Sequence, residues 1–123
     1  LQGERAPMYC TAIGKAMLAY LPARTLKKVF EQKLTQFTVN TIVDRESLEQ
    51  ELDIIRSRGY SIDNMEHEFG IKCVGMPIRK CSGEVYAALS ISGPSLRMSD
   101  EAIVHYAGLL HRSIRDIEES YQF

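Results

Sequence analysis

Residues 71–92, IKCVGMPIRKCSGEVYAALSIS, decide the fold of this chain. Two largely apolar runs, 71–79 and 85–92, flank a short connection that contains Gly83. A glycine in a short connection favours a tight reversal, so the simplest pairing of the two runs is an antiparallel hairpin. A Gly-Pro pair directly after the second run ends it.

The two predicted strands each have one bulky face and one small face, because side chains alternate across a strand. The bulky faces carry Val74, Met76 and Ile78 on the first strand, and Val85, Ala87, Leu89 and Ile91 on the second. The small faces carry Cys73 and Gly75 on the first strand, and Tyr86, Ala88, Ser90 and Ser92 on the second. If the two small faces align, they leave a shallow pocket lined by hydroxyls and a thiol. The alternative is that the two serines simply face water.

The segment after the hairpin predicts a long amphipathic helix. Ser99 is placed to cap it, and Asp100 and Glu101 follow in the first turn, where acidic side chains suit the helix dipole. Apolar residues then recur every three or four positions, at Ile103, Ala107, Leu110, Ile114, Ile117 and Tyr121. This spacing places them on one face of a helix.

Three shorter helices are expected before the hairpin. They cover residues 12–20, residues 23–32, and a segment that is capped by Asp44 and ends at Gly59. Residues 60–63 are predicted to form a strand, and residues 37–43 a short strand or an extended loop. Helices interleaved with antiparallel strands predict an α+β domain in which one sheet carries helices.

Composition predicts one compact domain that has no strong overall electrostatic field. The chain has 123 residues and 45% hydrophobic content, which is enough for one core. Its 15 basic and 16 acidic residues give a formal net charge of −1, so the overall charge does not attract nucleic acid. The densest basic stretch, 24–33, also carries Leu26, Val29 and Phe30 for a core, which is typical of a solvated helix face.

The cysteines and the hydropathy pattern indicate a cytoplasmic protein. Cys10, Cys73 and Cys81 are an odd number without the spacing of a disulfide framework, which suits a reducing compartment. No apolar run approaches the roughly 18 residues that span a membrane. The chain begins at Leu1 rather than at a methionine, so we expect it to be part of a longer protein.

The start of the first predicted helix is a candidate anion site. A helix N-terminus presents free N–H groups and a partial positive charge, so Thr11, Ala12 and Ile13 could hold a carboxylate or a phosphate without a basic side chain. The alternative is an ordinary capped helix in which Gly14 relieves close packing. The Gly-Lys pair is no phosphate-binding loop, because the upstream glycine is absent and alanine follows the lysine.

Asp63 ends a predicted strand and has two equally plausible roles: it could accept hydrogen bonds from a ligand hydroxyl, or it could cap the following turn. No GxSxG elbow and no local Cys–His motif is present, so we predict no catalytic residue and no cofactor. His67, Cys73, Cys10 and Asp63 could converge on a metal ion, but their spacing matches no standard zinc pattern, and no metal site is predicted.

Several motifs together resemble one family. TAIGKA at residues 11–16, RGYSIDNME at 58–66, GIKCVGMP at 70–77 and SISGPSLR at 90–97 occur in the order found in the effector-binding domain of IclR-type transcriptional regulators. The resemblance covers nearly the whole chain and extends to the branch that responds to sugar-acid breakdown products.

The resemblance implies a GAF-like effector domain, residues 1–123, which follows an N-terminal winged helix-turn-helix that this chain lacks. It also implies a homodimer or tetramer whose DNA affinity changes with a small metabolite, typically a carboxylate. Carried over by position, the effector-binding residues are Thr11, Ala12, Ile13, Asp63, Cys73, Ser90 and Ser92. Ala6 matches a position that usually supplies an apolar wall, although alanine fills it poorly.

The functional hypothesis is therefore the sensing of a small carboxylate, a 2-keto acid or a sugar acid. Relatives have further strands before the segment that starts here. Without those strands the pocket could be incomplete, and one edge of the sheet could be exposed. The main alternative is an interaction module with a vestigial pocket that serves oligomerisation. A zinc site is a weaker alternative.

Overall fold

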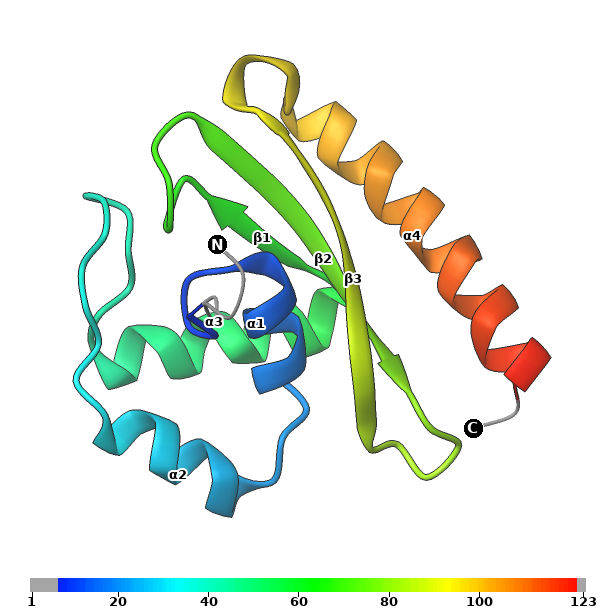
Figure 1. The fold of residues 1–123 in the computed structure, drawn as a ribbon, viewed down its shortest axis with the longest axis horizontal. Coiled ribbons are helices and arrows are strands. Elements are labelled where there is room, and N and C mark those ends of the chain that lie inside the picture. The colour runs from blue at the N-terminus through cyan, green and yellow to red at the C-terminus, as the bar shows by residue number, and fades with distance from the viewer. Residues whose placement is uncertain (1–6, 122–123) are drawn as a thin grey trace, which may run out of the picture.

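A computed structural model of the chain describes residues 7–121 and has the α+β architecture that the sequence predicts (Figure 1). The elements in chain order are α1 Ala12–Leu18, α2 Ala23–Glu31, α3 Arg45–Arg58, β1 Ser61–Asn64, β2 Ile71–Arg79, β3 Val85–Pro94, the 3-10 turn η1 Ser95–Arg97, and α4 Asp100–Tyr121. The described strands form one antiparallel sheet in the order β1-β2-β3.

The sheet lies between two helical layers, with α4 on one face and α1, α2 and α3 on the other side (Figure 1). Alternation along the hairpin decides which side chains meet which layer. Val74, Met76 and Ile78 are buried and form a core with Ile103, Ala107, Leu110 and Ile114 of α4. Ala87, Leu89 and Ile91 pack against the same core, so the predicted bulky face is confirmed at these positions. Val85, predicted for the same face, is not part of this core and pairs with Arg79, beyond an irregularity in the register. The helical stripe continues to Tyr121, but that side chain is 70% exposed, because the 3.6-residue period continues past the last residue that packs on the sheet.

The opposite face of the sheet lets α1 approach closely. A Cβ atom built at Gly75 would lie 2.6 Å from the carbonyl oxygen of Ala12, closer than such atoms can come. Ser61, the cross-strand partner of Gly75, donates its hydroxyl to the same carbonyl oxygen at 2.5 Å. Helix α1 therefore packs on the small face that alternation predicts.

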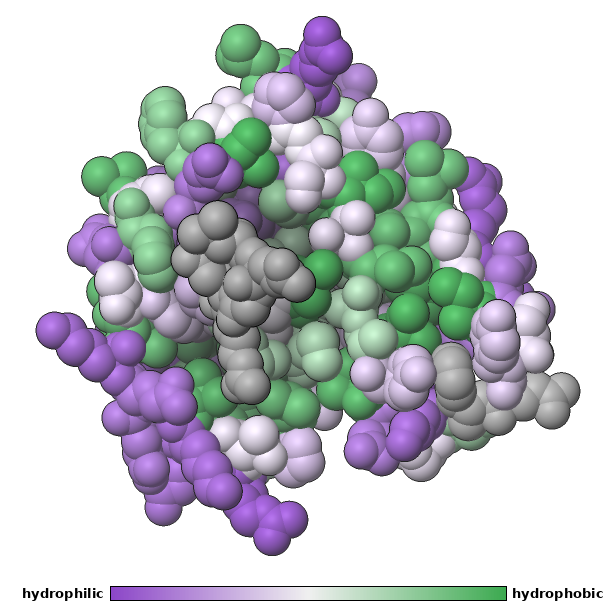
Figure 2. Space-filling model, viewed as in Figure 1, coloured by the Kyte–Doolittle hydropathy of each residue, from purple (hydrophilic) through white to green (hydrophobic). Residues whose placement is uncertain are grey.

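A second core lies between α1 and α3. It consists of the buried residues Leu18, Ala19, Leu48, Leu52 and Ile55. Helix α2 contributes Leu26, Val29 and Phe30, which are partly buried, while its basic residues face outward. Figure 2 shows hydrophilic side chains gathered over α2 at the lower left, which confirms the prediction of a solvated basic face.

Residues 37–43 form a loop rather than a strand, so the second of the two alternatives holds. The hydroxyl of Thr41 accepts hydrogen bonds from the backbone N–H groups of Phe37 and Thr38, at 3.0 and 2.9 Å. These N–H groups therefore have partners without a neighbouring strand. The first helix ends at Leu18, two residues earlier than predicted. Within residues 7–121 no helix has the length and apolar character to cross a bilayer.

Candidate functional site

A pocket of about 610 Å³ opens between the start of α1 and the sheet. Its wall contains all seven residues predicted as effector-binding: Thr11, Ala12, Ile13, Asp63, Cys73, Ser90 and Ser92. Six further residues complete the wall: Met8, Gly14, Met17, His67, Glu68 and Ile71. Ala6, the predicted apolar position, lies outside the described residues. Segments far apart in the sequence thus meet at one cavity.

Helix α1 presents its first turn to this pocket. Thr11 caps the helix: its hydroxyl oxygen accepts the Gly14 N–H at 3.1 Å and donates to the Pro7 carbonyl at 2.8 Å. The Thr11 hydroxyl is therefore already engaged. The N–H groups of Ala12 and Ile13 have no hydrogen-bond partner within the described part of the chain. These two groups are the donors that the helix start leaves for a ligand.

The hairpin supplies the opposite wall. Cys73 and Ser92 are cross-strand partners, and the Cys73 Sγ lies 3.0 Å from the Ser92 Oγ. Ser90 pairs with Gly75 one step further along. Burial raises the pKa of the Cys73 thiol, so this group is protonated at neutral pH and offers a neutral, polarisable surface. The two serines line a cavity instead of only facing bulk water.

Asp63 lies on the floor of the pocket and is only 4% exposed. Its Oδ1 accepts the N–H of Glu66 at 2.7 Å, so Asp63 caps the turn after β1. Burial raises the pKa of its carboxyl group, against the opposing effects of the Glu66 N–H and of Lys15. The two predicted roles are compatible, because a carboxylate has about four lone pairs and could accept from a ligand hydroxyl in addition to the Glu66 N–H and the Cys73 thiol.

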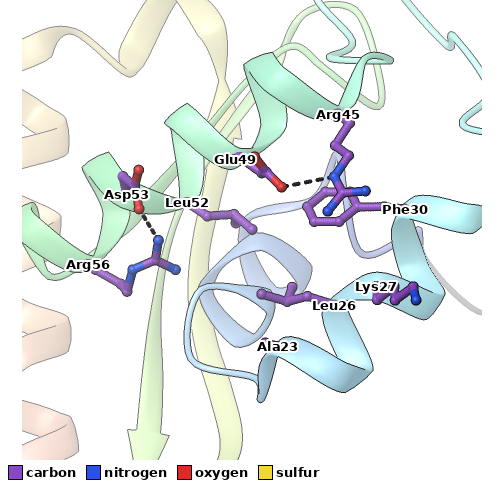
Figure 3. A pocket seen from close by; sticks show the side chains of 9 residues that line it. All are labelled: Ala23, Leu26, Lys27, Phe30, Arg45, Glu49, Leu52, Asp53 and Arg56. Carbon is purple, nitrogen blue, oxygen red and sulfur yellow. Dashed lines mark hydrogen bonds and ion pairs between the residues drawn. The ribbon is translucent and has the colours of Figure 1, made fainter.

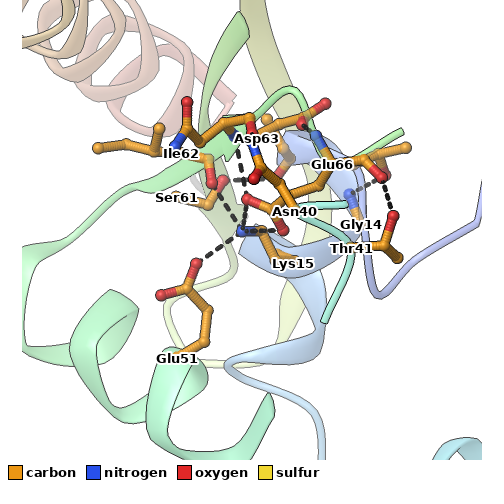
Figure 4. Close-up of polar contacts among 12 residues, drawn as sticks. Gly14, Lys15, Asn40, Thr41, Glu51, Ser61, Ile62, Asp63 and Glu66 are labelled. Carbon is orange, nitrogen blue, oxygen red and sulfur yellow. Dashed lines mark hydrogen bonds and ion pairs between the residues drawn. The ribbon is translucent and has the colours of Figure 1, made fainter. Parts of the chain in front are cut away.

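A buried ionic cluster centred on Lys15 lies between α1, α3 and the turn after β1, and sequence reasoning missed it (Figure 4). The Lys15 ammonium is fully buried and donates to Glu51 Oε2 and the Ile62 carbonyl, each at 2.6 Å, and to both carboxylate oxygens of Glu66 at 2.9 Å. Burial raises the pKa of Glu66, and Lys15 opposes that shift. One signal was present in the sequence. Lys15 is three residues after Ala12 and four before Ala19, which places it on the apolar stripe of a helix.

Charge is unevenly distributed around the pocket. Asp63 and Glu68 are its carboxylates and His67 its only titratable base, while no Lys or Arg is among the described lining residues. The ring of His67 packs edge-on against Phe37, 5.0 Å between centroids, at the rim. An anionic ligand would therefore be held by backbone N–H groups at α1 and not by a cationic clamp.

The structure does not gather a metal-ligand set. In the described range no group of three or more His, Cys, Asp and Glu side chains could hold a metal ion. Asp63, Cys73 and His67 line the pocket, but Cys10 is fully buried, and burial raises the pKa of its thiol to about 12. His105 and His111 are exposed on α4, on the other side of the sheet.

A smaller hollow of about 250 Å³ lies between α2 and α3 (Figure 3). Four of its five charged side chains are already paired along α3: Arg45 contacts Glu49 at 2.9 Å, and Arg56 contacts Asp53. Arg45 also stacks on Phe30, 4.9 Å from the ring centroid. This hollow is a seam between two helices in which both arginines are paired locally, so it is a weaker candidate for a ligand site.

Comparison with known proteins bears directly on the role of the larger pocket. The family described as "Bacterial transcriptional regulator IclR C-terminal" matches residues 1–119. The chain belongs to the IclR family. It corresponds to the C-terminal part of these regulators, as the motifs predicted, and its relatives are transcriptional regulators rather than enzymes.

Three similar proteins from this family illustrate the match. The HTH-type transcriptional regulator KdgR of Escherichia coli is 40% identical over 116 residues, which is 94% of this chain and 44% of KdgR. The crystal structure of the E. coli KdgR C-terminal domain has a TM-score of 0.90 and 38% identity, and the match covers 98% of this chain and 74% of that one. The inducer-binding domain of a PobR double mutant from Acinetobacter, in complex with 3-hydroxybenzoic acid, has a TM-score of 0.85 and 26% identity, covering 94% of this chain and 67% of that one. The chain spans less than half the length of the curated relatives it matches.

Proposed function

We propose that this chain is the effector-sensing domain of an IclR-type transcription regulator and that its pocket binds a small carboxylate. The observation that carries the proposal is the placement of two unpartnered N–H groups, at Ala12 and Ile13, in a cavity whose other wall carries Ser90 and Ser92. The helix start favours a carboxylate, and serine hydroxyls suit the oxygens of its other end. The PobR domain with 3-hydroxybenzoic acid supports an acidic ligand for this fold.

Each of the seven predicted effector-binding residues has a defined part in this proposal. The ligand carboxylate lies on the N–H groups at the start of α1, with the Thr11 cap holding that turn open. Ser90 and Ser92 bind keto or hydroxyl oxygens, and the second oxygen of Asp63 accepts from a ligand hydroxyl. Cys73 supplies a neutral wall. A 2-keto acid or a sugar acid combines these features in a size that the cavity admits.

Ligand binding at this pocket would regulate DNA binding by domains that lie outside this chain. In a homodimer or tetramer, ligand binding favours one arrangement of subunits and so biases DNA-binding domains that precede this segment. Typical coupling free energies between such sites are about 1 to 3 kcal/mol. Such a regulator acts in the cytoplasm, where the bacterial chromosome lies.

A thermal-shift screen with sodium pyruvate, sodium gluconate, sodium 3-hydroxybenzoate and zinc chloride tests the proposal. A ligand at a hundredfold excess over its dissociation constant adds about 2.7 kcal/mol to the free energy of unfolding, which raises Tm by several degrees. We expect a shift from one of the carboxylates. The combined Ser92→Ala and Asp63→Asn variant should bind that carboxylate about 10- to 100-fold more weakly, because two polar contacts are lost or altered.

The matched control is the combined Ser113→Ala and Asp116→Asn variant, which makes the same changes at exposed positions of α4. It should bind like the natural chain. Equal binding by the Ser92→Ala and Asp63→Asn variant would contradict the site assignment. A shift with zinc alone would favour the metal alternative.

A second candidate, an interaction module, draws support from exposed apolar side chains at the base of the hairpin. Phe69 is 81% exposed and Leu96 is 98% exposed, and the Ser95 N–H donates to the Gly70 carbonyl at 2.7 Å, which brings their neighbours together. If no carboxylate shifts Tm and the molecular mass in solution rises with concentration, this second function is the better description.

A further inference from the structure

Lys15 joins three segments that surround the pocket. Its ammonium contacts Glu51 on α3, and Glu66 and the Ile62 carbonyl on the β1 side. A lysine ammonium has three N–H donors, and here they are distributed over four acceptor oxygens with no access to water. No buried side-chain nitrogen or oxygen is left without a partner within residues 7–121. The cluster is therefore closed, and its geometry is determined by its own members.

One side of the cluster fixes Asp63. Glu66 accepts the Asn64 N–H at 3.0 Å through its side chain, while its own N–H donates to the Asp63 carboxylate. The turn is tight, with Met65 at a φ of 55°. The position of Asp63 on the pocket floor therefore depends on the position of Glu66, which Lys15 holds.

The same turn is braced from the loop before α3. The Thr41 hydroxyl donates to the Glu66 carbonyl at 2.5 Å, and the Thr38 hydroxyl donates to the Met65 carbonyl at 2.6 Å. Asn40 reaches the Asn64 carbonyl at 2.8 Å (Figure 4). The loop holds the outer side of the turn, so Lys15 is the contact that ties its inner side to α1.

The other side of the cluster is α1 itself. The Lys15 N–H closes the first turn of the helix on the Thr11 carbonyl at 2.9 Å. A displacement of Lys15 would therefore also displace the turn that presents the Ala12 and Ile13 N–H groups. The two pocket walls that a carboxylate and a hydroxyl would contact thus meet at one buried ammonium.

We propose that Lys15 is a positioning residue for the pocket: through Glu66 it sets the separation between the α1 N–H groups and Asp63. The effect of Lys15 on ligand affinity rests on the proposed function. The contacts that place the α1 N–H groups and Asp63 relative to each other do not depend on that function. Buried ion pairs contribute little net stability compared with apolar packing, and their best-attested role is to specify one arrangement. Glu51 anchors Lys15 to α3 and has no contact with the Asp63 turn, so its influence on the pocket is weaker.

A thiol-labelling experiment measures the geometry without a known ligand. In a Cys81→Ser background, Cys73 is the thiol open to Ellman's reagent, because Cys10 is 0% exposed, and mass spectrometry identifies the labelled site. Glu66→Gln, Lys15→Met and their combination are compared with Glu51→Gln. Glu49→Gln, on an exposed side chain of the same helix, is the matched control.

We expect Glu66→Gln to change the Cys73 labelling rate about 3- to 30-fold and to weaken binding of the carboxylate found in the thermal screen by a similar factor, typical of coupled contacts. Glu51→Gln should have a smaller effect, and Glu49→Gln none. Lys15→Met should add less in the Glu66→Gln background than it changes alone, because both substitutions remove the Lys15–Glu66 ion pair and only the contacts to Glu51 and the Ile62 carbonyl are lost in addition. If Lys15→Met does not fold, the Glu66→Gln and Glu51→Gln comparison still decides.

The positioning role is overturned if Glu66→Gln labels Cys73 and binds the carboxylate as Glu49→Gln does, whatever happens to its urea midpoint. A change in the midpoint alone would show that the cluster serves stability only. If the natural chain binds none of the carboxylates, the proposed function fails, and the Cys73 labelling rates still accept or reject the role of Lys15.

Discussion

Burial disfavours the charged form of the Glu66 carboxyl group, so the titration of this group makes the stability of the fold depend on pH. Burial raises its pKa above the ordinary value of 4.5, and the Lys15 ammonium only partly opposes the effect. The folded state therefore holds this proton more tightly than the unfolded chain does. The resulting stabilisation is fully present below pH 4.5 and is lost as pH rises through the folded-state pKa.

Glu66→Gln removes this titration. We expect the free energy of unfolding of the natural chain, relative to that of Glu66→Gln, to fall as pH rises above 4.5, with urea denaturation at a series of pH values as the measurement. Asp63, whose pKa burial also raises, remains in both proteins. The Glu49→Gln variant, changed at an exposed position, is the control. A flat difference would show that Lys15 balances burial at Glu66, and a difference that grows with pH would show that Lys15 outweighs it.

Single residues were predictable where their neighbours in sequence determine them. The Thr11 cap, the Asp63 turn and the small polar residues of the hairpin follow from local pattern, and they are found at the pocket: Thr11, Asp63, Cys73, Ser90 and Ser92. The Lys15 cluster was not predictable in the same way. Its carboxylate partners lie 36 and 51 residues away, and no periodicity links a helix to side chains at such separations.

The contact between α1 and β2 depends on Gly75 having no side chain. Gly75→Ala would place a Cβ atom 2.6 Å from the Ala12 carbonyl oxygen, which is backbone, and 2.8 Å from the Ser61 hydroxyl oxygen, so the helix itself would have to shift. We expect a loss of about 1 to 3 kcal/mol in the free energy of unfolding, as for other overpacked sites. Weaker carboxylate binding should accompany it, because α1 carries one wall of the pocket.

Gly108→Ala is the matched substitution in α4, where a Cβ atom would have no neighbour within 4 Å. Alanine in a helix interior is favoured over glycine by about 1 kcal/mol, so this variant should be more stable than the natural chain. Urea denaturation of both variants gives the comparison. Equal effects of the same sign would refute the close approach of α1 to the sheet.

At the level of elements, the hairpin and α4 were predicted from sequence because their periods of 2 and 3.6 are unbroken over many residues. Residues 37–43 have a β-branched composition, yet the loop forms because Thr38 and Thr41 bind backbone groups that a strand would pair. Threonine hydroxyls compete with ladders in this way, and composition alone does not show which interaction prevails.

At the scale of the whole molecule, residues 7–121 form one core on each side of the sheet, and of these two the one between α1 and α3 borders the pocket. Leu110→Ala removes a buried side chain of α4 from the core on the far side. We expect it to lower the free energy of unfolding by about 2 to 5 kcal/mol. Carboxylate affinity in the absence of denaturant should stay as in the natural chain, with calorimetry as the measurement. A large loss of affinity in the folded variant would show that the two layers are coupled.

The alternation of the hairpin also bears on how such domains diverge. On β2 the core positions are 74, 76 and 78 and the pocket positions are 71 and 73, while on β3 the core positions are 87, 89 and 91 and the pocket positions are 90 and 92. Point substitutions at the pocket positions can alter ligand preference while the core keeps its residues. A one-residue insertion or deletion would exchange the two sets at once. Evolution of new specificity in this fold should therefore proceed by substitution within the strands and confine length changes to the loops.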